Sequence, residues 1–169
     1  AYYAFGKAYG EMLQRYGITL EVKTTAGSAE NLQLLDKDDG GVDVAFVQGG
    51  VKRSGQADDL ISVGSLYYEP LWIFRDVGLG VNKLAGIKGR RIAVGREGSG
   101  TKVLAMQLLA PNDVSDQNTK IFSLGGQKAA DRLMLGEIDA AFFVTAHHSA
   151  VIQQLLRSKN LQLLSLQRA

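Results

Sequence analysis

The sequence predicts an α/β fold made of two similar lobes with largely parallel sheets. Three observations carry this prediction. Short β-branched runs alternate with helical patterns along most of the chain. A glycine-rich turn joins a strand pattern to a helix pattern within residues 90–110. Residues 42–47, VDVAFV, also recur as residues 138–144, IDAAFFV, which indicates a duplicated unit.

The first half of the chain carries the patterns of two helices and two strands. Apolar residues spaced three and four apart predict a helix over residues 1–16, with Phe5, Tyr9 and Met12 on its buried stripe. A second helix is expected from Ala29 to Leu35. The other expected elements are strands at 18–24 and 42–47, a turn at 48–50, a short helical turn at 56–60 and extended segments at 61–66 and 68–75.

The second half of the chain alternates strands and helices more regularly. A single helical turn is expected over residues 81–85, before the first strand. Strands are expected at 91–94, 119–124, 139–144 and 161–166, and helices at 101–110, 127–135 and 148–157. This order is typical of a sheet whose parallel strands are joined by helices.

The repeat also predicts the domain boundaries. Each copy follows a helix and a glycine, and a turn of small residues precedes each helix. We therefore expect a first lobe over residues 1–70, a second over 71–169, and a crossover at about 66–75, where Glu69-Pro70 favours extended chain. The second copy has one strand–loop–helix unit more than the first. This difference predicts an incomplete first lobe in a segment of a longer protein.

The glycine-rich turn over residues 95–100 is the first candidate site. Unpaired N–H groups and the helix dipole make a helix N-terminus after such a turn suitable for an anion. The spacing of Gly95 and Gly100 approaches that of a nucleotide P-loop, but Thr101-Lys102 reverses the required order. A dinucleotide fingerprint would need a glycine where Val103 stands. In every case the turn needs an N-cap, for which Ser99 or Thr101 is suited.

Composition excludes several classes of protein. Charged residues make up 21% of the chain without low-complexity tracts, which argues against disorder, and cysteine is absent, which excludes disulfides and thiolate chemistry. Residues 1–75 hold seven Lys/Arg and ten Asp/Glu, whereas residues 76–169 hold twelve and seven. Basic residues cluster near the glycine-rich turn without interleaved aromatic residues, so we expect a small anion there and no nucleic acid.

The sequence offers no convincing catalytic or metal site. Ser28, Ser99 and Thr101 could act as nucleophiles, but the adjacent His147 and His148 lack an evident orienting carboxylate. Neighbouring histidines on a helix start point apart, so no metal or other cofactor is predicted. Asp43 and Asp139 each precede a buried strand, and we expect both to bond to the preceding turn.

Five stretches, taken in order, resemble the TAXI-type solute-binding receptors of tripartite (TRAP) transporters, which belong to the type II periplasmic binding proteins. They are Tyr2-Tyr3, TTAGSAEN at 24–31, VDVAFVQ at 42–48, LYYEP at 66–70 and GSGT at 98–101. The resemblance covers nearly the whole chain. It implies a bilobed extracytoplasmic, periplasmic receptor that closes on a small anionic amino acid or carboxylate and delivers it to a membrane permease. The chain departs from the family by lacking the first strand, its glycine loop and the final crossover.

The resemblance also implies a set of ligand-binding residues. Two tyrosines would lie at the mouth of the first helix, and the second lobe would contribute its glycine-rich turn. The implied residues are Tyr2, Tyr3, Ala26, Gly27, Ser28, Gln48, Gly49, Tyr68, Ser99, Gly100 and Thr101. Tyr68 would lie with Tyr67 and Glu69 in or beside the hinge. On this interpretation the protein is not an enzyme.

Two other functions remain open at this point. A regulator's ligand-sensing effector domain would have the same bilobed fold, with a DNA-binding region upstream. A phosphoribosyl-transferase-like enzyme would need an acidic phosphoribose loop, which the sequence does not contain.

Overall fold

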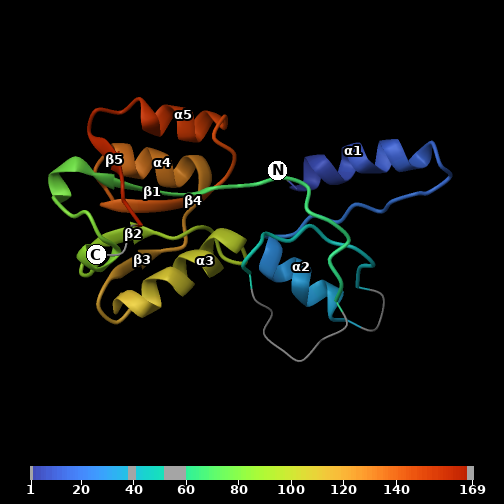
Figure 1. The fold of residues 1–169 in the computed structure, drawn as a ribbon, viewed down its shortest axis with the longest axis horizontal. Helices are drawn as coiled ribbons and strands as arrows, with labels where there is room; N and C mark the ends of the chain where they lie inside the picture. The colour runs from blue at the N-terminus through green and yellow to red at the C-terminus, as the bar shows by residue number, and fades with distance from the viewer. Residues whose placement is uncertain (1, 38–40, 52–59, 167–169) are drawn as a thin grey trace.

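The computed structural model describes residues 2–37, 41–51 and 60–166. We call residues 2–70 the N-terminal part and residues 71–166 the sheet body, after the predicted boundary. Figure 1 shows the sheet body on the left and the N-terminal part on the right, joined by the extended chain that leads into β1. Of the helical turn predicted at 56–60, all but Leu60 lies outside the described residues.

A single five-stranded sheet, in the order β3-β2-β4-β1-β5, forms the centre of the sheet body. Its strands are β1 (Leu71–Asp76), β2 (Arg91–Ala93), β3 (Lys120–Phe122), β4 (Ala140–Val144) and β5 (Leu161–Leu163). β2 pairs in parallel with β3 and β4, whereas β1 pairs antiparallel with β4 and β5. β1 therefore runs against the other four strands. It enters the sheet from the N-terminal part instead of from a crossover helix, which explains this exception to the predicted parallel order.

Three helices cover the two faces of this sheet, as Figure 1 shows. α3 (Gly100–Leu109) lies on one face, and α4 (Gly126–Met134) and α5 (Ala150–Leu156) lie on the other. Three short 3-10 helices complete the sheet body: η1 (Val77–Leu79), η2 (Leu84–Ile87) and η3 (Ala110–Asn112). No helix among the described residues is both long and apolar enough to span a membrane.

The alternation of side chains along the strands fills a core on each face. Ile73 of β1 and Phe142 of β4 belong to the core under α3, and the next residues, Phe74 and Phe143, belong to the core under α4 and α5. Each of these side chains is at most 4% exposed. The two cores make the sheet body a three-layer α/β structure, which confirms the predicted α/β class.

Asp139, the residue just before β4, forms a different contact from the one predicted. The Asp139 carboxylate accepts a 2.7 Å hydrogen bond from the Arg91 backbone N–H and pairs with the Arg91 guanidinium at 2.6 Å. These bonds cross to the neighbouring β2, so the expected bond to the preceding turn is wrong for Asp139. The parallel pairing of β2 with β4 places the two residues side by side.

The N-terminal part holds the two predicted helices, α1 (Tyr2–Gln14) and α2 (Ser28–Leu35). None of its described residues belongs to a strand, so the strands predicted at 18–24 and 42–47 are wrong. Both segments have strand-like composition but lack a ladder of backbone hydrogen bonds with a neighbour. A strand is stable only within such a ladder.

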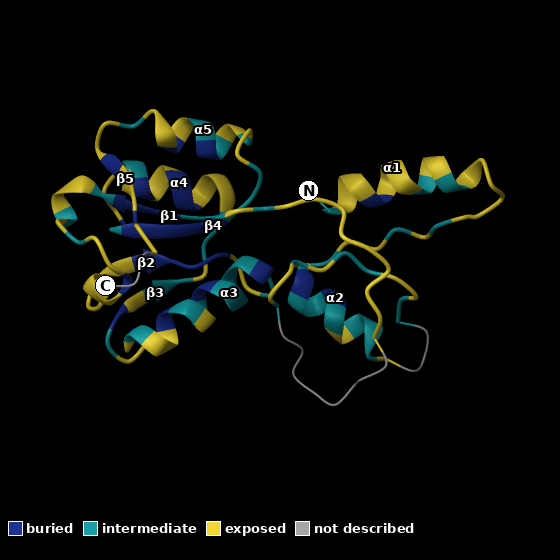
Figure 2. Cartoon of the chain, in the orientation of Figure 1, coloured by how far each residue is buried: buried dark blue, intermediate teal, exposed yellow. Residues whose placement is uncertain are grey.

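α1 also differs from its prediction in burial. Phe5, Tyr9 and Met12, on the expected buried stripe, are 45%, 42% and 56% exposed. Figure 2 shows α1 as a mostly exposed helix at one end of the molecule. Gly6 is its one buried residue, because Val22 packs against that glycine. The helix also contacts the rest of the N-terminal part through aromatic rings, with Phe5 stacked on Tyr67 at 5.2 Å.

Candidate functional site

The glycine-rich turn forms the predicted strand–turn–helix unit, from β2 to α3. Gly95 and Gly98 have φ angles of 100° and 72°, which glycine adopts without strain. The Ser99 hydroxyl caps α3 by accepting a 3.3 Å bond from the Lys102 N–H, and it donates a 2.6 Å bond to the Arg96 carbonyl. Among the described residues, the backbone N–H groups of Gly100 and Thr101 have no hydrogen-bond partner. They are free donors at the start of α3.

A second helix N-terminus, that of α2, has a similar construction. Its N-cap is Gly27, with φ 143° and no side-chain cap, and the preceding Ala26 donates a 2.6 Å N–H bond to the Glu30 carboxylate. Ser28 is 1% exposed, and its hydroxyl accepts a 2.9 Å bond from the Gln48 backbone N–H. The turn at 48–50 is therefore fixed to the start of α2.

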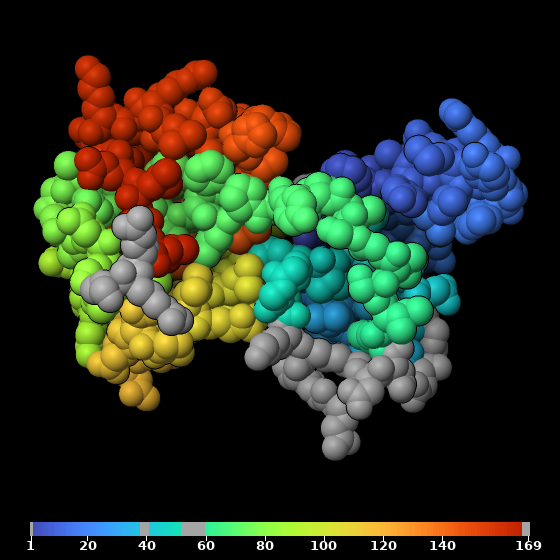
Figure 3. Space-filling view, in the orientation of Figure 1, coloured from blue at the N-terminus to red at the C-terminus, as the bar shows by residue number. Residues whose placement is uncertain are grey.

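The structure brings these two helix N-termini together. The Ala29 N–H at the start of α2 donates a 3.2 Å bond to the Gly98 carbonyl, just before α3. A Cβ atom on Gly27 would lie 3.1 Å from the Ser99 Cα. Figure 3 shows the two parts in contact on the viewed face, where the cyan N-terminal part meets the yellow surface of α3. Residues predicted separately on each lobe thus form one junction.

Gly100 has a role in this junction that differs from the one its sequence context suggests. It is the first residue of α3 and does not have a positive φ. A Cβ atom there would lie 2.8 Å from the Gln48 Oε1 and 3.0 Å from the Gln48 Cβ, so glycine is needed for close approach. The Gln48 Nε2 is buried and has no hydrogen-bond partner among the described residues. Its free N–H₂ group is a further donor at the junction.

A cluster of polar side chains lies beside the start of α2. Burial raises the pKa of Tyr2 to about 12, the nearby charge of Glu69 adds to the rise, and an interaction with the Ser28 hydroxyl opposes it. Burial also raises the pKa of the Glu69 carboxyl, and burial and then Glu69 raise that of Tyr67. The Tyr67 ring stacks on Phe5 at 5.2 Å. Sequence analysis placed Glu69 only near the hinge, and its signal was the position before Pro70 in the crossover.

Three of the predicted site residues are not drawn into this junction. Tyr68 is 94% exposed, while its neighbours Tyr67 and Glu69 interact with Tyr2. Tyr3 is 46% exposed, and the Lys7 ammonium lies 5.6 Å from its ring centre. Gly49 is exposed in the turn after Gln48. Their ligand-binding roles stay predictions.

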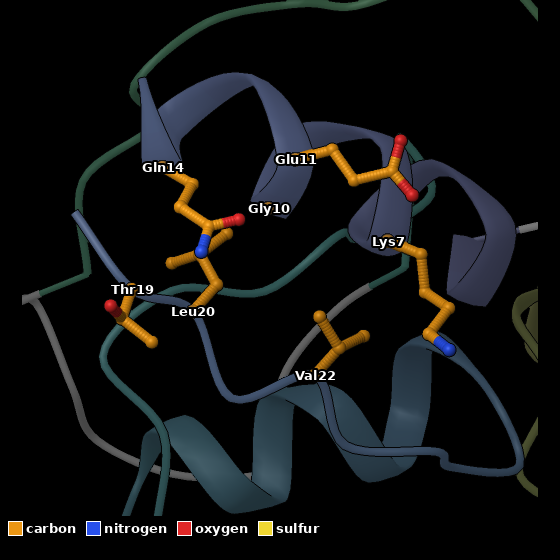
Figure 4. Close-up of a pocket in the computed structure, with 7 residues that line it drawn as sticks. All are labelled: Lys7, Gly10, Glu11, Gln14, Thr19, Leu20 and Val22. Atoms are coloured by element: carbon orange, nitrogen blue, oxygen red, sulfur yellow. The ribbon is translucent and has the colours of Figure 1, made fainter. Parts of the chain in front are cut away.

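Two surface pockets lie away from the junction. One, of about 210 Å³, is formed between α1 and residues 19–22, where Lys7 and Glu11 project from the helix above Leu20 and Val22 (Figure 4). The other, of about 350 Å³, lies where β2 and β4 begin and includes Arg91 and Asp139. Neither pocket contains a residue predicted to bind a ligand.

Comparison with known proteins shows which family this chain belongs to. A family model described as "NMT1-like family" matches residues 1–169. The chain belongs to the NMT1-like family. Among solved structures, an ancestral arginine-binding protein bound to arginine is similar with a TM-score of 0.58 and 16% identity, over 94% of this chain and 66% of that one. This likeness confirms the predicted fold class.

Other solved structures similar to this NMT1-like chain are also solute-binding proteins. The periplasmic aliphatic sulphonate binding protein SsuA from Escherichia coli has 20% identity and a TM-score of 0.46, over 57% of this chain and 33% of its own. PhnD1 from Prochlorococcus marinus, in complex with methylphosphonate, has 18% identity and a TM-score of 0.47, over 58% and 40%. The NMT1-like chain spans about a third of the length of the SsuA protein.

The serines of the junction and the nearby Lys102 make local contacts. Ser28 and Ser99 use their hydroxyls for local hydrogen bonds, and no histidine is among their partners. Lys102, which a nucleotide loop would aim at phosphate, instead pairs with Glu97 and donates a 3.0 Å bond to Ser123. No group of three or more metal-ligating side chains occurs in the part of the chain that the structure describes. What the junction offers is a set of N–H donors between two helix N-termini.

Proposed function

We propose that this NMT1-like chain is the binding part of an extracytoplasmic, periplasmic receptor that captures a small anionic solute, an amino acid or a carboxylate. One observation carries the proposal: the N-termini of α2 and α3 meet at Gly27 and Gly98. The solute is held between the N-terminal part and the sheet body, and no covalent step takes place.

The physical reason is the electrostatics of helix ends. Each helix N-terminus carries roughly half a positive elementary charge, so two facing ends repel each other unless an anion lies near both. The unpaired N–H groups of Gly100 and Thr101 and the free Gln48 amide are donors that an anionic group can use. Water competes poorly for such a group once the two parts enclose it.

The second part of the proposal concerns the mechanism of capture. The extended crossover before β1 is the hinge, and the two parts close on the solute by a rigid-body motion. The solute shifts the population toward the closed form by the difference between its affinities for the two forms. Small-angle scattering should show a decrease in the radius of gyration on adding solute.

The third part concerns the membrane partner. The receptor delivers its solute to the permease subunits of a transporter. The ordered stretches from Tyr2 to Thr101 support a TRAP permease through their resemblance to TAXI-type receptors. Transport assays with the permease encoded beside this chain, and with an ABC-type permease as the comparison, test this assignment.

Calorimetric titration of the full chain tests the binding site. The panel consists of amino acids and small carboxylates, together with the chemical classes that similar proteins bind: arginine, methylphosphonate and an aliphatic sulphonate. Gly100→Val should abolish binding, because its Cβ displaces Gln48, while the helical backbone at this position tolerates valine. Thr101→Ala should cost about 0.5–1.5 kcal/mol, the value of one hydrogen bond, or up to ~3 kcal/mol if its partner is charged.

Lys102→Ala is the matched control, because Lys102 pairs with Glu97 and Ser123 away from the free N–H groups. It should weaken binding least of the three substitutions. A larger loss for Lys102→Ala than for Gly100→Val would contradict the proposed site and favour a nucleotide-type loop.

A further inference from the structure

The contact between the N-terminal part and the sheet body is built on glycines. A Cβ atom on Gly98 would lie 2.8 Å from the Ala26 Cβ, and one on Gly27 would lie 3.1 Å from the Ser99 Cα and 3.3 Å from the Gly98 carbonyl oxygen. A Cβ atom on Gly50 would lie 3.0 Å from the Leu104 Cδ2. At each point glycine lets the two parts approach more closely than any other residue would allow.

A backbone hydrogen bond joins the two parts at the same place. The Ala29 N–H donates to the Gly98 carbonyl at 3.2 Å, and both groups belong to the main chain. This bond uses one of the orphan donors at the start of α2, which lacks a side-chain cap. The hydrogen bond between the two parts is therefore made by main-chain atoms alone.

We infer that Gly27 and Gly98 are positioning residues of the solute site: their backbone contact clasps the two parts together in the closed form and sets the gap between α2 and α3. The statement about the gap rests on the proposed function, whereas the clasp itself does not. The clasp stabilises the closed form that the solute favours, so the apparent affinity varies with the fraction of molecules that can form the clasp.

Gly98→Ala is the variant that opens the clasp. The added Cβ would lie 2.8 Å from the Ala26 Cβ, so the segment around Gly98 or the segment around Ala26 must move. Gly89→Ala is the matched control, since Gly89 has φ 77° against 72° for Gly98 but no atom within 4 Å of the added Cβ. Both variants carry the same backbone strain, and only Gly98→Ala disturbs the contact between the parts.

Ala26→Gly provides a rescue, because the Ala26 Cβ is the sole atom within 4 Å of the Cβ added at Gly98. In the double variant the Cβ added at position 98 no longer meets the Ala26 Cβ, while the backbone strain of alanine at position 98 remains. A local structural defect would not be repaired in this way, so the rescue separates positioning from general destabilisation.

The measurement is the distance between two spin labels in the solute-free full chain. The sequence has no cysteine, so Glu11→Cys on α1 and Lys128→Cys on α4 give two unique exposed labelling sites. In the unsubstituted chain and in Gly89→Ala, a fraction of the molecules should show the distance of the clasped form beside that of the open form. Gly98→Ala should reduce the clasped population by about fivefold or more, and Ala26→Gly should restore it.

A titration of the same variants with the tightest-binding solute of the panel gives the second readout. Apparent affinity should fall by the same factor as the population of the clasped form. Equal distance distributions for Gly98→Ala and Gly89→Ala would overturn the clasp, whatever binds. If Gly98→Ala opened the chain as expected but none of the panel bound any variant, the clasp would stand and the proposed function would fail.

Discussion

Phe142 and Phe46 occupy equivalent positions in the two copies of the repeated segment, yet their surroundings differ. Phe142 is fully buried in the core between β4 and α3. Phe46 is half-buried in a chain without a strand, where its ring meets Tyr2 at 5.8 Å and Tyr9 at 6.4 Å. The difference lies in the neighbours: β4 has strand partners on both sides, and residues 42–47 have none among the described residues.

Each of the two parts is consequently stabilised by a different kind of interaction. Every buried hydrophobic side chain of the described residues lies between Ile73 and Leu164, in the sheet body. In the N-terminal part the buried residues are Gly6, Ser28 and Asn31, two of which are polar. Asn31 accepts a 2.5 Å bond from the Thr25 hydroxyl and donates a 2.7 Å bond to the Phe46 carbonyl. Hydrogen bonds thus stabilise the N-terminal part, whereas buried apolar side chains stabilise the sheet body.

The largest expected effect compares the two phenylalanines directly. Phe142→Ala should lower the free energy of unfolding by about 3–5 kcal/mol, because it leaves a cavity in a closed core. Phe46→Ala removes a half-buried ring and should cost about 1 kcal/mol. Denaturant unfolding of both variants measures the difference. Equal losses would mean that the N-terminal part has a core as tightly packed as that of the sheet body.

A buried charge in the sheet body gives the next largest effect. Arg75 is 5% exposed, and its guanidinium donates to the carbonyls of Asp76 and Val77 and to the side chains of Asn82 and Gln162. Arg75→Met should cost about 2–3 kcal/mol, because these acceptors lose a charged donor.

Arg132→Met is the control for Arg75→Met, since Arg132 pairs with Glu137 at 3.4 Å on the surface. This control should cost less than about 1 kcal/mol. Thermal unfolding of the two variants measures both losses. A control as damaging as Arg75→Met would remove the distinction between buried and exposed arginines here.

Asn31→Ala should produce a smaller effect, confined to the N-terminal part. It removes the links from α2 to Thr25 and to the Phe46 carbonyl, at a cost of about 1–2 kcal/mol. Hydrogen exchange should become faster at residues 25–35 and 42–48 and stay unchanged in β4, because the two parts have separate interiors. Uniform acceleration throughout the chain would show instead that the two parts unfold as one unit.

The smallest expected effect is spectroscopic. Ultraviolet titration should show one tyrosine that ionises near pH 12, absent in Tyr2→Phe. Because the folded state holds this proton more tightly than the unfolded one, Tyr2 makes stability fall as pH rises from 10 toward 12. Glu69→Gln should lower the pKa of Tyr2 by removing a neighbouring negative charge, and Glu11→Gln should leave it unchanged. An unaltered Tyr2 titration in Glu69→Gln would exclude this interaction.

Local sequence determined the helices and strands of the sheet body and the glycine-rich turn that the sheet body contributes to the junction. Glycines with positive φ and the Ser99 cap are short-range features, so the strand–turn–helix unit around residues 91–109 could be predicted from its own residues. The small residues at 26–28 and Gln48 were predicted on the first lobe, across the site from Gly100 on the second, and the structure places the two sets in contact.

Only the tertiary structure decided which faces are buried and which side chains reach the junction. In extended chain, successive side chains point to opposite sides, so the sequence could not show which of Tyr67, Tyr68 and Glu69 face the rest of the molecule, and it was Tyr68 that was predicted to bind the solute. In the structure Tyr67 stacks on Phe5 and Glu69 interacts with Tyr2, whereas Tyr68 is 94% exposed. In the same way, the pattern at 42–47 resembles that of β4, but a strand forms only where a neighbour completes its hydrogen-bond ladder. Patterns along a chain specify what each segment can form, and contacts between distant segments decide what it does form.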